Sequence, residues 1–265
     1  GITVECIGDV PAADPGVVTD EADNQGVPTV HFVGDVSDGG SCPEIITRTY
    51  SVTDICGGQI LVTQTITVLD ITAPPATSPA TVNVECIGDV PAADVNLITD
   101  EADNCTAVPT IAFVGDVSDG NTCPETITRT YSVTDDCGNT TNVTQTIIVN
   151  DITAPVGTAP VTVNVECIAD VPASDITLVT GVSDNCTAVP TVAFVSDASD
   201  GNTCPETITR TYSITDDCGN VTNVTQSIIV NDVTSPTASN PAMTIVPGGP
   251  APAADPLVVI DEADN

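Results

Sequence analysis

Internal repetition constrains the architecture of this 265-residue chain more than any other feature of its sequence. Several cysteines recur at a spacing of 81 positions: Cys86 and Cys167, Cys123 and Cys204, and Cys137 and Cys218. Cys6 precedes Cys86 by 80 positions, because one residue is missing near Gln25. Self-similarity at such a period is typical of tandem repeats. It predicts repeats at about 1–80, 81–161 and 162–241, followed by the beginning of a fourth repeat at 242–265.

The best preserved stretch of the repeat spans residues 122–139, and it returns at 203–220 and, less regularly, at 41–58. Between residues 126 and 134, apolar side chains and the arginine alternate with Thr and Ser. Since a strand directs successive side chains to opposite faces, this strand has one apolar face and one hydroxyl face. Further strands are predicted in the second repeat at 81–86, 96–99, 110–114 and 142–149.

Several short strands and regular turns in each repeat predict an all-β fold of tandem immunoglobulin-like β-sandwiches. The connection between repeats is short and contains proline, as in residues 150–155. Short, stiff linkers between sandwiches predict an elongated rod. Tyr131 lies where the tyrosine corner of an immunoglobulin-like fold is expected.

The composition excludes some classes of partner and favours others. The chain has 37 acidic residues and 3 basic ones, which gives a formal net charge of -34. Nucleic acid is excluded as a partner because phosphate contacts need Lys and Arg. No apolar run is long enough to insert into a membrane, and we expect the chain to be a segment of a longer secreted protein.

Eleven cysteines in a chain this poor in aromatic residues indicate disulfide bonds and an oxidising, extracellular compartment. Zinc is the competing interpretation, but the chain has no CxxC pair and a single histidine, His31. Four cysteines in each full repeat allow three pairings. In an immunoglobulin-like layout, Cys105 and Cys137 lie at one end of the repeat, and Cys86 and Cys123 lie toward the other.

This layout predicts disulfide bonds within each repeat: Cys86–Cys123, Cys105–Cys137, Cys167–Cys204, Cys186–Cys218 and, in the first repeat, Cys6–Cys42. Gln25 stands where the first repeat lacks its fourth cysteine, which leaves Cys56 as a free thiol. The alternative is that Cys56 is a buried thiol left by chance drift.

Acidic residues recur in register at two loops of each repeat and in the linker that precedes it. The topology brings these three groups together at each junction, where their oxygens suit Ca²⁺ better than the stricter octahedral Mg²⁺. The predicted ligands at the first junction are Asp70, Asp100, Glu101, Asp103, Asn104, Asp135, Asp136 and Asn139. Those at the second are Asp151, Asp184, Asn185, Asp216 and Asp217, and those at the third are Asp232, Asp261, Asp264 and Asn265. The alternative is that these residues are hydrated turn formers.

The three basic residues are Arg48, Arg129 and Arg210, one in each repeat, within the same Thr-Arg-Thr-Tyr context. We interpret them as structural: the stem packs in the core while the guanidinium meets a carboxylate or carbonyl groups. His31 is replaced by alanine in the other repeats, and no nucleophile recurs together with a histidine. The chain is therefore predicted not to be an enzyme, and no catalytic residues are assigned.

The recurring pattern VEC…DNC…CPETITRTYSVTDDCGN…VTQTIIVNDITAP resembles the HYR-like repeats of very large secreted surface proteins of gliding Bacteroidota, in particular SprB-type gliding adhesins exported by type IX secretion. The resemblance covers the whole chain. It implies a cell-surface filament or adhesin for gliding motility or surface attachment, with neighbouring repeats and an unknown surface or glycan ligand as partners.

Three functions stay open at this point: a structural spacer, an array of glycan- or protein-binding modules, and the accessory region of a larger secreted hydrolase. Residues 121–135 and 202–216 differ only at Val133, which is Ile214 in the third repeat. Such near identity favours a spacer. The threonine-rich faces are the candidate surface for lateral self-association.

Overall fold

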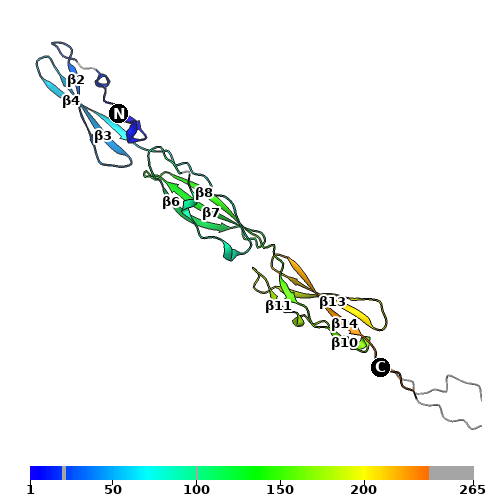
Figure 1. Cartoon of the computed structure of the whole chain (residues 1–265). Coiled ribbons are helices and arrows are strands. Elements are labelled where there is room, and N and C mark those ends of the chain that lie inside the picture. Colours follow the sequence, from blue (N-terminus) through cyan, green and yellow to red (C-terminus); the bar gives the residue numbers. More distant parts are fainter. Residues whose placement is uncertain (20–21, 100, 239–265) are drawn as a thin grey trace, which may run out of the picture. The chain divides into compact units, whose positions relative to one another are not determined.

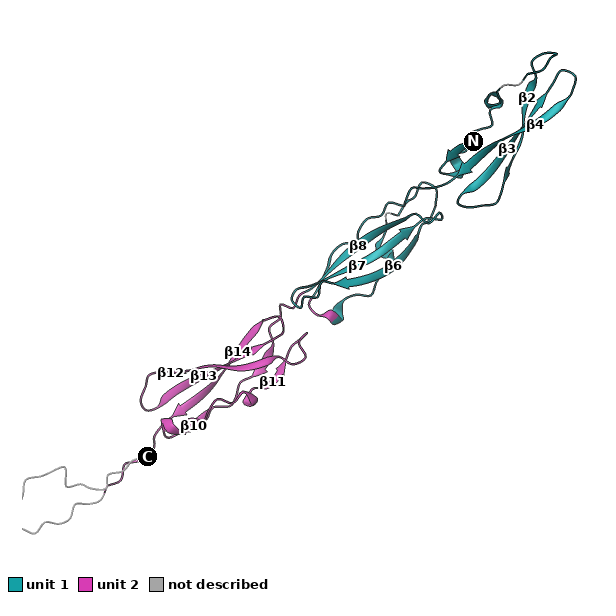
Figure 2. Cartoon of the chain, turned by 180° about the vertical axis from the view of Figure 1, so that it is seen from behind, with its two compact units in different colours: residues 1–84, 88–149 teal, residues 85–87, 150–265 magenta. Residues whose placement is uncertain are grey.

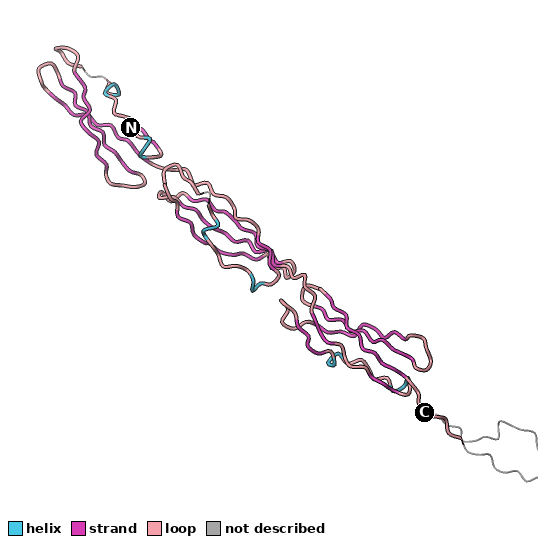
Figure 3. Tube along the Cα trace, viewed as in Figure 1, coloured by secondary structure: helices cyan, strands magenta, loops and turns pink. Residues whose placement is uncertain are grey.

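A computed structural model describes residues 1–19, 22–99 and 101–238 of the chain (Figure 1). These residues form strands and short 3₁₀-helices, without an α-helix in the described ranges (Figure 3). The prediction of an all-β fold is confirmed. The strands assemble into three open four-stranded sheets and one two-stranded sheet.

The three four-stranded sheets share one topology. A short N-terminal edge strand pairs in parallel with the strand of its sheet that comes last in the sequence. That strand pairs antiparallel with the central strand, and the central strand pairs antiparallel with the other edge strand. The first sheet consists of β1 (Ile2–Val4), β4 (Gln59–Val68), β3 (Glu44–Thr53) and β2 (Thr29–Ser37). The second consists of β5 (Val82–Val84), β8 (Thr140–Val149), β7 (Glu125–Thr134) and β6 (Thr110–Ser118). The third consists of β10 (Val163–Val165), β14 (Val221–Val230), β13 (Glu206–Thr215) and β12 (Thr191–Ser199).

The central strand has the two-faced character that its sequence predicts. In β7 the side chains of Ile127, Tyr131 and Val133 are buried, and the hydroxyl residues between them are more exposed. Tyr131 and Val133 pack with Ile98, whereas Ile127 packs with Ile147 of β8. The core of this sheet therefore consists of two small clusters along one strand.

A second layer faces the central strand, and it is better formed in the third repeat than in the second. There, β9 (Val156–Thr158) and β11 (Thr180–Ser183) form the two-stranded sheet. Val179 packs against Tyr212 and Ile214 of β13. A Cβ atom at Gly157 would overlap the terminal methyl group of Ile214, so a larger residue there would require that side chain to shift.

The predicted strand at residues 96–99 is wrong, because Val95–Leu97 forms a 3₁₀-helix. The carboxylate of Asp94 accepts a hydrogen bond from the backbone N–H of Asn96 (3.0 Å), which favours a turn over a strand. The other 3₁₀-helices are Ile7–Asp9, Pro15–Val17, Ile87–Asp89, Ile168–Asp170 and Ile176–Leu178.

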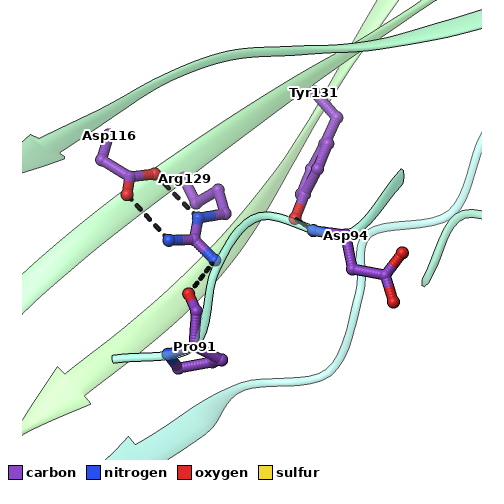
Figure 4. A network of polar contacts seen from close by, with 5 residues as sticks. All are labelled: Pro91, Asp94, Asp116, Arg129 and Tyr131. Carbon is purple, nitrogen blue, oxygen red and sulfur yellow. Dashed lines mark hydrogen bonds and ion pairs between the residues drawn. The ribbon is translucent and has the colours of Figure 1, made fainter. Parts of the chain in front are cut away.

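The arginines have the structural role that their sequence context predicts (Figure 4). The Nε and Nη2 atoms of Arg129 each donate to the carboxylate of Asp116 at 2.9 Å, and Nη1 donates to the carbonyl of Pro91 at 2.8 Å. Arg129 is 4% exposed, so its charge is buried against this partner. Arg48 and Arg210 make the same three contacts in the other repeats.

Tyr131 has a different role from the predicted tyrosine corner. Its hydroxyl oxygen accepts a hydrogen bond from the backbone N–H of Asp94 at 3.2 Å, 37 positions upstream (Figure 4). A tyrosine corner binds the backbone only a few residues away. Arg129 and Tyr131 thus hold the segment around residues 91–94 against the central strand.

The chain divides into two compact units (Figure 2). The first consists of residues 1–84 and 88–149, and the second of residues 85–87 and 150–265. The first unit therefore contains two of the four-stranded sheets and the second contains the third. The repeat boundaries predicted from the cysteine spacing stay a prediction.

Candidate metal sites between aspartates of adjacent repeats

The disulfide bonds join cysteines of different repeats. In the first unit Cys6 is bonded to Cys105, with their Cα atoms 5.1 Å apart, and Cys42 is bonded to Cys137, with Cα atoms 5.4 Å apart. In the second unit Cys86 is bonded to Cys186. Cys123 and Cys218 each take part in a disulfide bond as well.

The predicted pairing within repeats is therefore wrong, as the observed bonds and the free thiol of Cys204 show. The rejected pairs are Cys6–Cys42, Cys86–Cys123, Cys105–Cys137, Cys167–Cys204 and Cys186–Cys218. The first unit shows why the bonds form between repeats. Cys6 and Cys42 lie at one end of the first repeat, and this end meets the end of the second repeat that carries Cys105 and Cys137. The prediction that Cys56 is a free thiol is confirmed, and its side chain is exposed.

Three aspartates meet beside the disulfides of the first unit. Asp70 follows β4, Asp103 lies in the loop before β6, and Asp135 begins the turn after β7. One carboxylate oxygen of each lies within 4.8 Å of the others. Asp70 and Asp135 are buried and Asp103 is partly buried. We call this group the first aspartate cluster.

Local backbone hydrogen bonds orient each carboxylate of this cluster. Asp103 Oδ2 accepts from the backbone N–H groups of Cys105 (3.0 Å) and Thr106 (2.7 Å). Asp135 Oδ1 accepts from the backbone N–H of Asn139 (2.8 Å), and Asp70 Oδ1 accepts from that of Thr72 (3.0 Å). Each aspartate is thus held by the turn that it begins.

Oxygen atoms that these turns do not use are left without partners. Asp70 Oδ2 and Asp103 Oδ1 are buried and have no hydrogen-bond partner, and neither does Oε2 of the nearby Glu101. A buried carboxylate oxygen without a partner is costly, and neighbouring negative charges add repulsion. A bound divalent cation would supply the missing partner, since Ca²⁺ is coordinated by such oxygens.

The same arrangement occurs in the second unit, and we call it the second aspartate cluster: Asp151, Asp184 and Asp216. Asp184 Oδ2 accepts from the backbone N–H groups of Cys186 (2.9 Å) and Thr187 (2.8 Å). Asp151 Oδ2 and Asp184 Oδ1 are again buried without a partner. The recurrence of the same unsatisfied atoms argues against chance placement of acidic turns.

The pKa values in the second cluster show how its charges interact. Burial raises the pKa of Asp151, and the charges of Asp184, Asp216 and Glu85 raise it further, against a hydrogen bond from the N–H of Thr153. Burial also acts to raise the pKa of Asp184, but hydrogen bonds from the backbone of residues 185–187 outweigh it and hold that pKa below its usual value. An ionised Asp184 is therefore favoured beside an Asp151 whose ionisation is opposed.

Asparagine amides connect the two sides of each cluster. Asn104 Nδ2 donates to Glu5 Oε2 (2.8 Å), and Asn139 Nδ2 donates to the backbone carbonyl of Asp70 (3.0 Å). In the second unit Asn185 donates to Glu85, and Asn220 donates to the carbonyl of Asp151. The predicted ligands Asn104, Asn139 and Asn185 thus use their amide nitrogens to bridge segments of adjacent repeats.

The structure brings together the central part of the predicted ligand set. Asp136 and Asp217 are exposed and lie outside the clusters. Asp100, Asp261, Asp264 and Asn265 lie outside the described residues, so the predicted third junction with Asp232 is not described. Sequence reasoning missed Glu5 and Glu85, although a glutamate precedes the first cysteine of every repeat.

The chain belongs to the family of HYR-like domains with 4 cysteines, whose model matches residues 1–68 and 155–230, more than half of the sequence. Family membership and the disulfide bonds fit an extracellular repeat domain. No curated protein sequence matches the chain. Among the described residues, no helix is both long and apolar enough to cross a membrane.

Some solved cadherin structures are similar to this chain in part. A structure of protocadherin gammaB7 EC3-6 as a cis-dimer is 15% identical, covers 82% of this chain and 70% of its own, and has a TM-score of 0.28. Drosophila N-cadherin EC1-4 is 12% identical, with coverages of 77% and 67% and a TM-score of 0.29. The human Desmocollin-1 ectodomain is 14% identical, with coverages of 74% and 49% and a TM-score of 0.25. Scores this low say nothing about the ligands of this chain.

Proposed function

We propose that this chain is a repeat segment of a secreted cell-surface filament or adhesin, in which Ca²⁺ and disulfide bonds fix each repeat to the next. Its function is that of a structural spacer. The observation that carries the proposal is the pair of aspartate clusters, each with two buried, unpartnered oxygens supplied by adjacent repeats.

Calcium is the favoured ion because of the ligand chemistry. The clusters offer carboxylate oxygens, and Ca²⁺ tolerates irregular sets of six to eight oxygens completed by water. Mg²⁺ requires a tighter octahedron. Zinc is disfavoured because the nearby Cys6, Cys105, Cys86 and Cys186 are oxidised to disulfides and cannot act as thiolates.

The disulfide bonds support a mechanical role. Each repeat contains only one Phe and one Tyr, so its core is small. A bond between cysteines 95 to 100 positions apart stabilises the folded chain by about 4–5 kcal/mol in the chain-entropy model. Because these bonds cross from one repeat to the next, pulling on the chain would load covalent bonds at the junction.

The finer assignment is a SprB-type gliding adhesin of Bacteroidota, exported by type IX secretion and used for gliding motility or surface attachment. The resemblance of the repeat pattern to that group supports it. The net charge of -34 suits a long surface filament, because mutual repulsion between copies opposes collapse and aggregation.

The test is thermal unfolding of the oxidised full chain with a chelator and with about 1 mM Ca²⁺, the range of extracellular calcium modules. We expect Ca²⁺ to raise the melting temperature, because an ion that binds only the folded form must stabilise it. Equal Mg²⁺ should raise it less. The double variant Asp151→Ala, Asp184→Ala should lose most of the shift.

The matched control is Asp217→Ala, which removes an exposed aspartate near the same cluster and should keep the full Ca²⁺ response. If the melting temperature of the wild-type chain is the same with Ca²⁺ and with chelator, the proposal of a calcium-held spacer fails. Small-angle scattering of the same samples gives a second readout. A spacer stiffened by Ca²⁺ should have different dimensions with the ion and with chelator.

A further inference from the structure

The disulfide bond between Cys86 and Cys186 lies beside the second aspartate cluster. One carboxylate oxygen of Glu85, one of Asp151 and the sulfur of Cys186 lie within 4.8 Å of one another. Asp151 is 4% exposed, and its Oδ2 has no hydrogen-bond partner. The unpartnered oxygen and the bond that joins the two repeats are therefore parts of one site.

The bond connects two segments that each carry carboxylates of this site. Glu85 directly precedes Cys86, and Asp184 lies two residues before the other cysteine. The backbone N–H of Cys186 donates to Asp184 Oδ2 at 2.9 Å, so the cysteine and the carboxylate share one turn. The amide nitrogen of Asn185 donates to Glu85 Oε2 at 2.7 Å and lies 3.7 Å from the sulfur of Cys86. The closed bond therefore fixes the carboxylates of the two segments relative to each other.

The first unit has the same arrangement around Cys6 and Cys105. Glu5 directly precedes Cys6. Asp103 Oδ2 accepts from the backbone N–H of Cys105, two residues later, at 3.0 Å. The amide nitrogen of Asn104 donates to Glu5 Oε2 at 2.8 Å and lies 3.7 Å from the sulfur of Cys6. The same connection between disulfide and aspartate cluster thus occurs twice, and each copy can serve as a control for the other.

We propose that Ca²⁺ binding and the disulfide bond are thermodynamically coupled at each aspartate cluster, so that bound Ca²⁺ protects the bond from reduction. The inference rests on the calcium binding proposed above. While the bond is closed, the ion does not have to order the two segments, and its affinity is higher. Because coupling between two equilibria is reciprocal, the ion must favour the closed bond by the same factor. Calcium thereby regulates how resistant the joint is to thiols.

Reduction by a dithiol such as dithiothreitol makes this coupling measurable. A thiolate of the reagent attacks one protein sulfur, and the other cysteine leaves as a thiolate that takes up a proton. The second thiol of the reagent then attacks its own sulfur in the mixed disulfide and releases the remaining cysteine. Two electrons and two protons pass to the protein, and the reagent closes to a cyclic disulfide.

The experiment equilibrates the full-length chain with mixtures of reduced and oxidised dithiothreitol, in chelator and in about 1 mM Ca²⁺. Free thiols are alkylated, and peptide mapping measures the reduced fraction at Cys186 and at Cys105 in the same sample. We expect half-reduction in Ca²⁺ to need a ratio of reduced to oxidised reagent about tenfold higher than in chelator. This factor lies within the range of about 5- to 150-fold that is typical of coupled sites.

Asp151→Ala separates the two clusters within one molecule. The protection of Cys86–Cys186 by Ca²⁺ should be lost, whereas Cys6–Cys105, beside the unchanged first cluster, should keep its shift. Equal protection of both bonds in this variant would overturn the inference. An unchanged half-reduction ratio in a wild-type chain whose melting temperature rises with Ca²⁺ would also overturn it, and would leave the calcium-held spacer intact. If Ca²⁺ does not raise the melting temperature, the proposed function fails and the inference fails with it.

A second measurement does not depend on how Asp151→Ala folds. Calorimetric titration of Ca²⁺ into the oxidised double variant Cys86→Ser, Cys186→Ser should find one site with its wild-type affinity and one about tenfold weaker. Reciprocity requires this factor to equal the one from the reduction experiment. Wild-type affinity at both clusters would contradict the coupling.

Discussion

The side-chain amide of Asn220, in the turn after β13, donates to the backbone carbonyl of Asp151 at 3.0 Å, and also to Asp216 Oδ2 at 2.8 Å. Asn139 makes the same two contacts in the first unit. One amide therefore joins the segment that precedes a repeat to an aspartate of that repeat. The two sides of each aspartate cluster are positioned by protein contacts in addition to any bound ion.

Asn220→Ala is expected to destabilise the second unit by about 1–2 kcal/mol, because two hydrogen bonds are lost and one acceptor is a carboxylate. The rise in melting temperature with Ca²⁺ should also become smaller, since the aspartates are less well positioned. Thermal unfolding with and without Ca²⁺ measures both effects. The control is Asn202→Ala, whose amide binds only Asp200 within its own exposed loop; equal losses in the two variants would contradict the bridging role of Asn220.

Asp151→Asn should have opposite effects on the stability of the fold in the presence and absence of Ca²⁺. Without Ca²⁺ the variant is expected to be more stable than wild type, because burial and the charges of Asp184, Asp216 and Glu85 oppose ionisation of Asp151. With Ca²⁺ it should be less stable, because a charged ligand is lost. Melting temperatures in chelator and in Ca²⁺ measure the crossover, and a variant that is less stable in both conditions would contradict charge repulsion in the cluster.

The fold could be predicted where the side-chain period decides it. The alternation around Ile127, Tyr131 and Val133 indicates a two-faced strand, and β7 buries that face. The second layer was harder to predict. A short segment such as Val95–Leu97 alternates like a strand, but the hydrogen bond from Asn96 to Asp94 makes it a turn.

The disulfide pairing could not be predicted, because cysteine spacing is the same for bonds within and between repeats. The layout correctly placed Cys6 with Cys42 at one end and Cys105 with Cys137 at the other. Whether the two cysteines at one end bond to each other or to cysteines of the next repeat depends on how closely the repeats meet. The aspartates were easier to predict, since acidic residues recur at the ends of strands.

The disulfide bonds between repeats give a direct chemical prediction. Digestion of the oxidised chain without reduction should release a peptide pair linked through Cys86 and Cys186. The variant Cys186→Ser should lower the stability of the second unit by about 2–5 kcal/mol, as removal of a native disulfide from a small domain does. The control is Cys56→Ser, which removes a free thiol and should leave stability unchanged. Recovery of Cys86 linked to Cys123 would contradict the structure.

The ion pair between Arg210, which is buried, and the partly exposed Asp197 predicts a pH dependence. Hydrogen bonds from Arg210 lower the pKa of Asp197 from its ordinary value of 3.8. The folded chain therefore binds this proton less tightly than the unfolded chain, so the pair stabilises the fold above about pH 4 and loses its effect as the pH falls through the lowered pKa.

Asp197→Asn should lower the free energy of unfolding by about 2 kcal/mol at neutral pH, because Arg210 is 4% exposed and its buried guanidinium would keep only a neutral partner. This loss of stability is expected to be smaller than that of a fully buried pair, because the Asp197 side chain is 34% exposed. Denaturant unfolding in chelator, from neutral pH to below pH 4, should show the difference from wild type shrinking toward zero. The exposed Asp170→Asn serves as the control, and a difference that stays constant across this range would show that Asp197 does not stabilise the fold through its charge.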